Sequence, residues 1–462
     1  MSNVIIATFV LGYIFIALEN ATKVSKAGVA LFMSVLCWGA YMLAADGYVS
    51  NFYQQAFTDY LQHDAGASAM GFITEKIFSG HVAETCETIL FLMGAMTIVE
   101  VVDSNGGFNF VTRRLKTDNT TALLWKTAIL TFFLSALLDN MTTCIVMVMV
   151  LKKLVADKQT RMLYAGIVII AANAGGAFSP IGDVTTIMLW IKGCVSTTGI
   201  IKGLFLPSVI SVAIPALIMM PMLKRCTLTP AEQKSHQQED KCPGFPRNAR
   251  VAIFCIGVIG LMLVPVFRSV TSLPPFVGVM GVLAILWITT EIMIRHNKRL
   301  LKIENEVRVS SIIKKIDMST ILFFLGILLT VGALQETGTL NIFGMWLSNT
   351  FGNVYIVDGL IGAMSAIVDN VPLVASAMGM YNIEPSGTIG AMQAYCQDGF
   401  FWELLAYCAG TGGSMLIIGS AAGVVVMGLE NISFGWYLKH FTWLALIGYI
   451  AGIAAYWIQS LL

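Results

Sequence analysis

Charged residues are scarce in this sequence. Only 12% of the 462 residues are Asp, Glu, Lys or Arg, whereas a soluble globular chain carries about twice that fraction. Hydrophobic residues make up 56% of the chain, and the mean hydropathy is +0.77. There is also no basic tract with interleaved aromatic residues, and the net charge is only +1. The composition therefore excludes an ordinary soluble domain, gives no sign of a nucleic-acid partner, and predicts that the chain is surrounded by lipid.

Metal-binding patterns are absent as well. The nine cysteines contain no Cys-x-x-Cys pair and no Cys/His spacing of a metal site, and the five histidines are scattered. Most of the cysteines lie in apolar stretches, where Cys behaves as a small hydrophobic residue. We therefore expect no bound cofactor and no enzyme chemistry.

Apolar stretches long enough to cross a membrane, which requires about 20 residues, recur along the whole chain. The first of them has no basic residue before it and no small-residue cleavage site after it, so we expect a retained helix rather than a signal peptide. The pattern predicts an all-α polytopic membrane protein with ten crossings, at 4–18, 28–45, 85–102, 164–190, 203–223, 251–267, 276–294, 319–335, 402–430 and 438–458.

The basic residues predict the orientation, because cytoplasmic loops carry the excess of Lys and Arg. Of the 28 basic residues, all but Lys76, Lys192, Lys202 and Arg268 fall in a few segments of one side. With these segments in the cytoplasm, both termini lie on the outer side. The segments are 19–27, 103–126, 151–163, 224–250, 295–317 and the position of Lys439.

Two further apolar stretches have both ends on one side of the membrane. Residues 122–155 have basic residues at both ends, and residues 354–380 lie within 336–401, which contains no Lys or Arg. Each half of such a stretch has about a dozen residues, too few to cross. We therefore predict two re-entrant hairpins, one entering from the cytoplasm and one from outside.

The two hairpins share a sequence, SALLDN at 135–140 and SAIVDN at 365–370. NAGGAFSPIGD at 173–183 likewise matches GTGGSMLIIGS at 410–420, and LFLMGAMTIVEVVDSNGGF matches LFFLGILLTVGALQETGTL. Each half contributes five crossings, an odd number, so the second copy is expected upside down, as in many secondary transporters. The predicted domains are repeat 1–223, cytoplasmic linker 224–250 and inverted repeat 251–462, with broken helices at 164–190 and 402–430.

Polar residues at the hairpin tips and helix breaks predict a cation site near the middle of the membrane. Interrupted helices free backbone groups that can serve as ion ligands where they line a cavity. Carboxylate and amide oxygens suit a small hard cation such as Na⁺ or Li⁺, and a carboxylate can take up a proton instead. The candidates are Ser135, Asp139, Asn140, Thr142, Gly175, Gly176, Asp183, Ser365, Asp369, Asn370, Gly412 and Gly413, with Asp139, Asn140, Asp369 and Asn370 as Na⁺ ligands.

Four other ionisable residues lie around the start and the end of the predicted helix 85–102. They are His81, Glu84, Glu87 and Glu100. A buried ion pair, an interface position or a part in transport would each explain them.

The motifs SALLDNMTT, SAIVDNVP and AANAGGAFSPIGDVTT resemble those of the NhaD-type sodium/proton antiporters of the ion transporter superfamily. The resemblance implies export of Na⁺ or Li⁺ against proton entry, in a bacterial inner membrane or, as the second choice, a plastid envelope. It also implies a homodimer in which a transport domain moves like an elevator against a scaffold. The ion site that it implies contains Ser135, Asp139, Asn140, Asn173, Asp183, Ser365, Asp369 and Asn370.

Two alternatives stay open at this point. An exporter of arsenite or another oxyanion, or a carboxylate transporter, is possible on the same fold, although aspartates at the tips disfavour an anionic substrate. An intramembrane aspartyl protease would also need two aspartates. Its Gly-x-Gly-Asp motif fails here, however, because Pro180 stands where the first glycine is required.

Overall fold

The computed structural model describes residues 1–17, 22–63, 68–106, 115, 117, 119–223, 245–296, 308–367 and 370–461. Within these ranges the secondary structure is helical, and the only extended pairing is an isolated bridge between Glu384 and Cys396. The all-α class is therefore confirmed. Asp369 and most of the predicted linker 224–250 lie outside the described residues.

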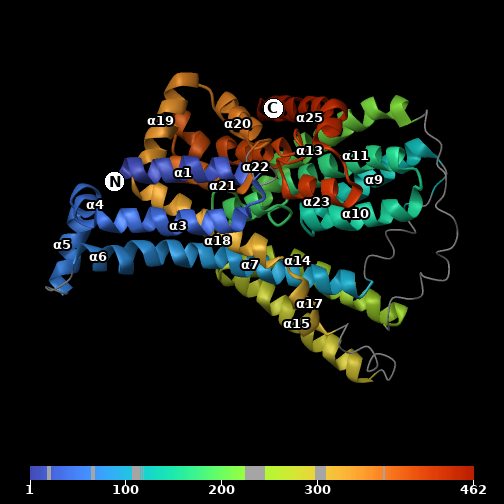
Figure 1. Ribbon diagram of the computed structural model, residues 1–462, viewed down its shortest axis with the longest axis horizontal. Coiled ribbons are helices and arrows are strands. Elements are labelled where there is room, and N and C mark those ends of the chain that lie inside the picture. Colours follow the sequence, from blue (N-terminus) through green and yellow to red (C-terminus); the bar gives the residue numbers. More distant parts are fainter. Residues whose placement is uncertain are drawn as a thin grey trace. The chain divides into compact units, whose positions relative to one another are not determined.

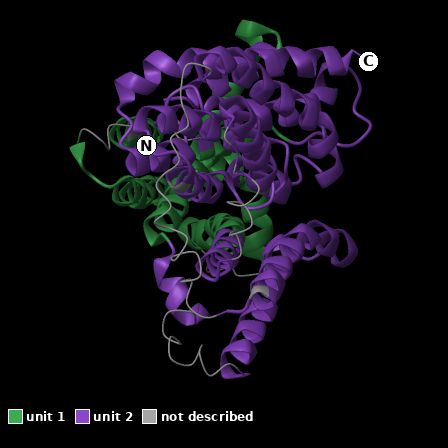
Figure 2. Ribbon diagram, turned by 90° about the vertical axis from the view of Figure 1, so that its right-hand side faces the viewer, with its two compact units in different colours: residues 1–90, 317–353, 371–382 green, residues 91–316, 354–370, 383–462 purple. Residues whose placement is uncertain are grey.

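The chain forms two compact units (Figure 2). Unit 1 consists of residues 1–90, 317–353 and 371–382, and unit 2 of residues 91–316, 354–370 and 383–462. Each unit contains segments of both predicted repeats. The compact units therefore do not follow the predicted repeat boundaries, which stay a prediction.

Unit 1 is built around α3 (Lys26–Leu43), which packs against α18 (Met318–Glu336) and α1 (Ser2–Ala17) (Figure 1). Gly326 allows α18 to approach α3 closely, because a Cβ atom there would lie 2.5 Å from the backbone of Ala30 and Leu31. Small residues allow such close packing of membrane helices. The other elements of unit 1 are α4 (Ala45–Phe52), α5 (Gln54–His63), α6 (Ala69–Phe72), the π-helix Ile73–Phe78, the first half of α7 (Ser79–Ser104), α19 (Thr339–Phe351) and most of α21 (Asn370–Met380).

Unit 2 contains two pairs of helices that are interrupted by short breaks, α11 (Lys158–Ala177) with α12 (Val184–Lys192), and α22 (Phe400–Gly412) with α23 (Ala421–Glu430). The pair α9 (Thr120–Ser135) and α10 (Asn140–Leu154) packs against α11, and α20 (Val354–Met364) packs against α22 (Figure 1). The breaks place polar residues between helix ends. The remaining helices are α13 (Thr197–Leu223), α14 (Arg247–Thr271), α15 (Pro275–His296), α17 (Val309–Ile312), α24 (Phe434–His440) and α25 (Thr442–Ser460).

Most of the predicted membrane crossings are present among the described residues as long apolar helices. Among the described residues, seven helices are long and apolar enough to cross, or eight if the bent pair α23 and α24 counts as one span. They include seven of the ten predicted crossings. The predicted crossing 4–18 is a helix of 16 residues, and breaks interrupt 164–190 after Ala177 and 402–430 after Gly412. The chain is thus a polytopic membrane protein in which several apolar helices are short.

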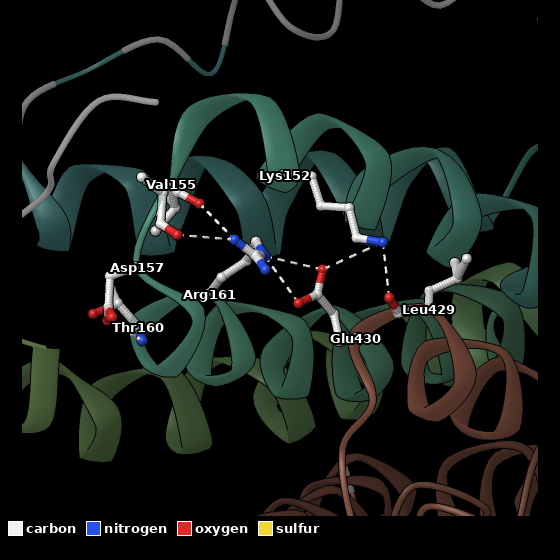
Figure 3. Close-up of polar contacts among 8 residues, drawn as sticks. Lys152, Val155, Asp157, Thr160, Arg161, Leu429 and Glu430 are labelled. Carbon is white, nitrogen blue, oxygen red and sulfur yellow. Dashed lines mark hydrogen bonds and ion pairs between the residues drawn. The ribbon is translucent and has the colours of Figure 1, made fainter. Parts of the chain in front are cut away.

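A buried ion pair joins three helix ends in unit 2 (Figure 3). The Arg161 Nε atom donates to both carboxylate oxygens of Glu430, at 3.0 and 2.8 Å, and the Glu430 side chain is fully buried. Arg161 also donates to the carbonyl of Val155, and the Lys152 Nζ atom donates to the carbonyl of Leu429 at 2.7 Å. These contacts tie the end of α10 and the start of α11 to the end of α23.

Replacing Glu430 with Ala is expected to destabilise the protein by about 3 to 5 kcal/mol, because Arg161 would keep a largely buried charge without its partner. Asp157→Ala, at the start of α11, is the control. It removes the N-cap that accepts from the Thr160 amide at 2.7 Å, which contributes about 1 kcal/mol, and an exposed carboxylate close to Arg161, while the Arg161–Glu430 pair is retained. Thermal unfolding of the purified protein in detergent measures both. Equal midpoints for the two variants would contradict the role of the buried pair.

Candidate functional site

The break between α9 and α10 is closed by Asp139, the N-cap of α10. Its Oδ1 atom accepts from the Thr142 amide and its Oδ2 atom from the Thr142 hydroxyl, both at 2.7 Å. The backbone of Asp139 has a φ of +152°, a value that L-residues seldom adopt and that persists only where the surroundings hold it. The carboxylate is therefore held against its own helix end.

Asp183, the N-cap of α12, is the centre of a buried polar network. Only 2% of the residue is exposed. Its Oδ2 atom accepts from the Asn140 amide group at 2.7 Å, and both of its carboxylate oxygens lie 3.4 Å from the Nδ2 atom of Asn370. Thr185 donates to Oδ1 through its backbone amide and its hydroxyl, at 3.0 and 3.1 Å. One carboxylate thus collects donors from both Asp-Asn tips.

Asn173 extends this network from α11 to the break between α22 and α23. Its Oδ1 atom accepts from Asn140 at 3.2 Å, and its Nδ2 atom donates to the hydroxyls of Ser414 and Ser420 at 2.9 and 3.0 Å. Ser420 is the N-cap of α23 and accepts from the Gly423 amide. The two helix breaks therefore meet at side chains that are fully or almost fully buried.

The same contacts recur at matching positions of the two halves. The Ser135 hydroxyl donates to the carbonyl of Ala172 at 2.6 Å, and the Ser365 hydroxyl donates to the carbonyl of Ala409 at 2.9 Å. In each case the serine at the end of the first helix of the pair donates to the carbonyl that stands three residues before the double glycine of the neighbouring helix. The matched contacts support a structural duplication of the site.

The double glycines allow a close approach at both breaks. A Cβ atom on Gly175 would overlap the carbonyl oxygen of Phe132, and one on Gly412 would overlap that of Gly362. Phe132 and Gly362 each stand three residues before the tip serine. A Cβ atom on Gly176 would lie 2.6 Å from the Gly182 oxygen, and one on Gly413 would lie 2.9 Å from the Gly419 oxygen. The two breaks are therefore equivalent in their backbone contacts as well as in their serine hydrogen bonds.

Comparison with known proteins identifies the family. The sequence model described as "Citrate transporter" matches residues 7–396. Sodium/proton antiporter 1 of Arabidopsis thaliana is 42% identical over 449 residues, which cover 97% of this chain and 71% of that protein. The Na(+)/H(+) antiporter NhaD of Vibrio cholerae is 30% identical over 481 residues, 96% of this chain and 89% of that protein. The chain belongs to the family of the NhaD antiporters.

A solved structure gives the same answer for the fold. The crystal structure of the YdaH transporter of Alcanivorax borkumensis matches with a TM-score of 0.52 at 15% identity, and covers 85% of this chain and 90% of that one. At this identity the match concerns the fold alone. The family, rather than this structural match, makes the NhaD-type chain a transporter and not an enzyme.

The predicted site residues of the NhaD-type chain are partly brought together. Asn140, Asn173, Asp183 and Asn370 form one hydrogen-bonded network. Asp139 lies next to it in sequence but is hydrogen-bonded to Thr142, and Asp369 lies outside the described residues. Sequence reasoning missed Thr185, Ser414 and Ser420. The alignment of NAGGAFSPIGD with GTGGSMLIIGS places Ser420 opposite Asp183.

The four weaker candidates have other contacts. In unit 1 the His81 Nε2 atom lies 2.8 Å from Glu336 Oε1. In unit 2 Glu100 lies 3.7 Å from Lys315 and accepts from Ser104. Glu84 is exposed and Glu87 is half-buried. These contacts give His81 a hydrogen-bond partner and Glu100 an ion-pair partner.

The chemistry of the network favours a small cation or a proton. Asn140, Asn370 and Thr185 stabilise the Asp183 carboxylate through hydrogen bonds but carry no charge, so a bound Na⁺ or H⁺ would supply the neutralising charge. Three helix N-termini, capped by Asp139, Asp183 and Ser420, stabilise negative charge in unit 2. No group of three or more His, Cys, Asp or Glu side chains in the described part of the chain could hold a metal ion. Oxygen ligands of mixed type are suited to an ion that binds and leaves.

Replacing Gly175 with Ala is expected to destabilise the protein by about 1 to 3 kcal/mol, because the added methyl group overlaps a backbone carbonyl that cannot move alone. Gly428→Ala is the matched control. It lies in α23 with no atom near its added Cβ, and Ala there should stabilise the helix by up to about 1 kcal/mol. Thermal unfolding in detergent compares the two. A Gly175→Ala protein as stable as the parent would show that the close approach of α9 and α11 is not required.

Proposed function

We propose that this protein exports Na⁺, or Li⁺, in exchange for H⁺ as a secondary antiporter. The observation that carries the proposal is the buried Asp183 carboxylate, which receives hydrogen bonds from Asn140 of one tip and Asn370 of the other. Sodium/proton antiport is the activity named for its relatives in plants and bacteria. An intramembrane carboxylate is costly to keep charged and can be neutralised either by a proton or by a sodium ion, so the two compete.

In the proposed cycle the carboxylates of Asp139, Asp183 and Asp369 release protons on one side and accept Na⁺ there. Ser135, Asn140, Thr142, Asn173, Ser365 and Asn370, with carbonyls freed at Gly175, Gly176, Gly412 and Gly413, replace the water around the ion. Because helix ends from both halves contribute, movement of the hairpins and broken helices as a body would carry the site between the two sides. We propose an elevator-like motion within a homodimer, in which the partner holds the scaffold in place.

The orientation of the cycle follows from the basic loops. We propose both termini and residues 386–398 on the outer side, residues 224–250 in the cytoplasm, and the inner membrane of a bacterium as the location. Labelling of single cysteines with an impermeant reagent tests this: position 237 is expected to react only from the cytoplasmic side. Reaction from outside would overturn the orientation and the inversion of the repeats.

A second candidate is transport of an anion, since the matching family model is described as a citrate transporter. Two observations disfavour it: a carboxylate at the centre of the network, and Asp-Asn at the first tip. Both would repel a carboxylate or oxyanion substrate.

The experiment that tests the function is dye-monitored proton flux in vesicles containing the purified protein. Addition of Na⁺ or Li⁺ is expected to dissipate a preformed pH gradient, while K⁺ and citrate are expected to leave it unchanged. A response to citrate alone would favour the second candidate. The absence of any response to Na⁺ or Li⁺ would contradict the antiport function.

A further inference from the structure

Asp358 is a buried carboxyl group that the proposed ion site does not use. It lies on α20 and is completely buried, and neither of its oxygens has a hydrogen-bond partner among the described residues. Asp139 and Asp183, by contrast, are both hydrogen-bonded. A carboxylate without donors is costly in a membrane interior, so the Asp358 group holds a proton whenever no other charge compensates it.

Asp358 shares a helix face with the second hairpin tip. Asp358, Gly362 and Ser365 follow one another at spacings of four and three residues, which places them on one stripe of α20. This stripe packs on α22: a Cβ atom on Gly362 would lie 2.5 Å from the Cys408 oxygen, and Ser365 donates to Ala409. Seven residues of helix correspond to about 10 Å. Asp358 therefore lies on the face of α20 that packs against α22, about two helical turns before the tip that carries Asn370.

The groups around Asp358 come from α22 and α25. One turn along α20 from Asp358, a Cβ atom on Gly362 would overlap the Tyr449 hydroxyl of α25 and the Cys408 carbonyl of α22. Tyr449 donates to the carbonyl of Gly359 at 2.8 Å, which fixes α25 against α20. The other titratable groups on these three helices are Tyr355 of α20, whose ring lies 6.4 Å from that of Tyr456, and Tyr407 and Glu403 of α22.

Glu403 lies on α22 between this α20–α22–α25 contact and the loop that precedes α22. Tyr456 donates to Glu403 Oε2 at 2.8 Å, and Glu403 is only 8% exposed. Asp398, in the loop, accepts from the Ser196 amide and packs against Gly199 of α13, one helical turn from the glycine that Glu403 contacts. On the side of α13, Glu403 packs against Gly203, next to the exposed Lys202. The described ion pairs include neither Asp358 nor Glu403.

We propose that Asp358 and Glu403, with Tyr456 between α22 and α25, form a proton-binding site that is separate from the Na⁺ site and supplies protons to the second hairpin tip. Three carboxyl groups, Asp398, Glu403 and Asp358, then form a series from the loop before α22 to the middle of α20. Binding is a simple acid–base step in which a carboxylate takes up one proton from the loop side. The use of this proton in exchange rests on the proposed function, whereas its binding to Asp358 does not.

Carbodiimide labelling of the unmodified protein tests the binding directly. The O–H of a protonated, buried carboxylic acid adds across the C=N bond of dicyclohexylcarbodiimide, and rearrangement leaves a stable N-acylurea that mass spectrometry locates. We expect an adduct on Asp358 that decreases as the pH is raised between about 5 and 9, the range reached by buried carboxyl groups. An adduct that does not change with pH, or no adduct at Asp358, would overturn the proposal.

Transport measurements with Asp358→Asn test the separation of the two sites. In vesicles, radioactive Na⁺ exchange against Na⁺ needs no proton and is expected to stay within about twofold of the parent, while Na⁺ flux driven by a pH gradient is expected to fall about tenfold or more. Asp157→Asn, the same change at an exposed N-cap, is expected to alter neither. An equal loss of both fluxes, or of neither, would contradict a separate proton site. If the parent protein moves no Na⁺ in either assay, the proposed function fails, and the labelling experiment still decides whether Asp358 binds a proton. The labelling likewise decides the matter if Asp358→Asn does not fold.

Discussion

Asp183→Asn is expected to reduce Na⁺-driven proton flux by about 100-fold or more while leaving the protein folded. Ligand and supporting residues of metal sites commonly control affinity or activity by this much, and Asp183 accepts donors from Asn140, Asn370 and Thr185. Asn has the same shape but cannot bind a proton or supply a charge. The variant is expected to unfold at the same or a higher temperature, because removal of a buried charge removes its desolvation cost.

Asp139→Asn and Asp369→Asn are expected to cause the same loss, because the two residues occupy equivalent tip positions in SALLDN and SAIVDN. Asn at position 139 can still cap α10, so the helix end is retained. Proton flux in vesicles, with Asp157→Asn as the control for an exposed aspartate, measures the effect. Near-normal flux in Asp183→Asn would remove the central residue from the mechanism.

The second large effect is the dependence of Na⁺ affinity on pH. If Na⁺ displaces one proton from a shared site, its half-saturating concentration is expected to rise about tenfold for each pH unit lowered while the site is protonated, and more steeply for two protons. At pH values where the site is no longer protonated, the half-saturating Na⁺ concentration becomes constant. The flux is therefore expected to switch on as the pH rises.

The measurement is the half-saturating Na⁺ concentration of vesicle transport between about pH 6.5 and 9, where a buried carboxyl group can titrate. Thr142→Ala is a useful companion, because it removes the hydroxyl that donates to Asp139 and is expected to shift the dependence without abolishing it. A half-saturating concentration that is constant over the whole range would mean that Na⁺ and H⁺ use different sites.

The sequence predicted the class of fold and the positions of the helix interruptions better than the contacts among them. Scarce charge and repeated apolar stretches indicate membrane helices because lipid cannot solvate exposed backbone groups. Asp139 and Asp183 act as N-caps, a role for which aspartate is intrinsically suited. These features depend on local chemistry, which a single sequence carries.

The network around Asp183 could not be predicted in the same way. Asn140 and Asn370 donate to Asp183, and Asn173 accepts from Asn140. Only the folded chain determines which of the matched polar residues meet. Asp358, in contrast, was visible as an isolated acidic residue in the apolar segment VYIVDGLIGAM. It was overlooked because it has no counterpart in the duplicated motifs. The short helices α4, α5 and α19 do not appear among the predicted elements because each is shorter than a membrane crossing.

Proton release on Na⁺ binding tests the central claim, a carboxylate site shared by the two ions, most directly. Purified protein in weakly buffered detergent solution is mixed with NaCl at a pH where the site is protonated, and the change in pH is recorded. We expect acidification with Na⁺ and Li⁺, none with K⁺, and a strongly reduced signal in Asp183→Asn. If saturating Na⁺ releases no protons from the unmodified protein at any pH between about 6.5 and 9, the shared site is contradicted.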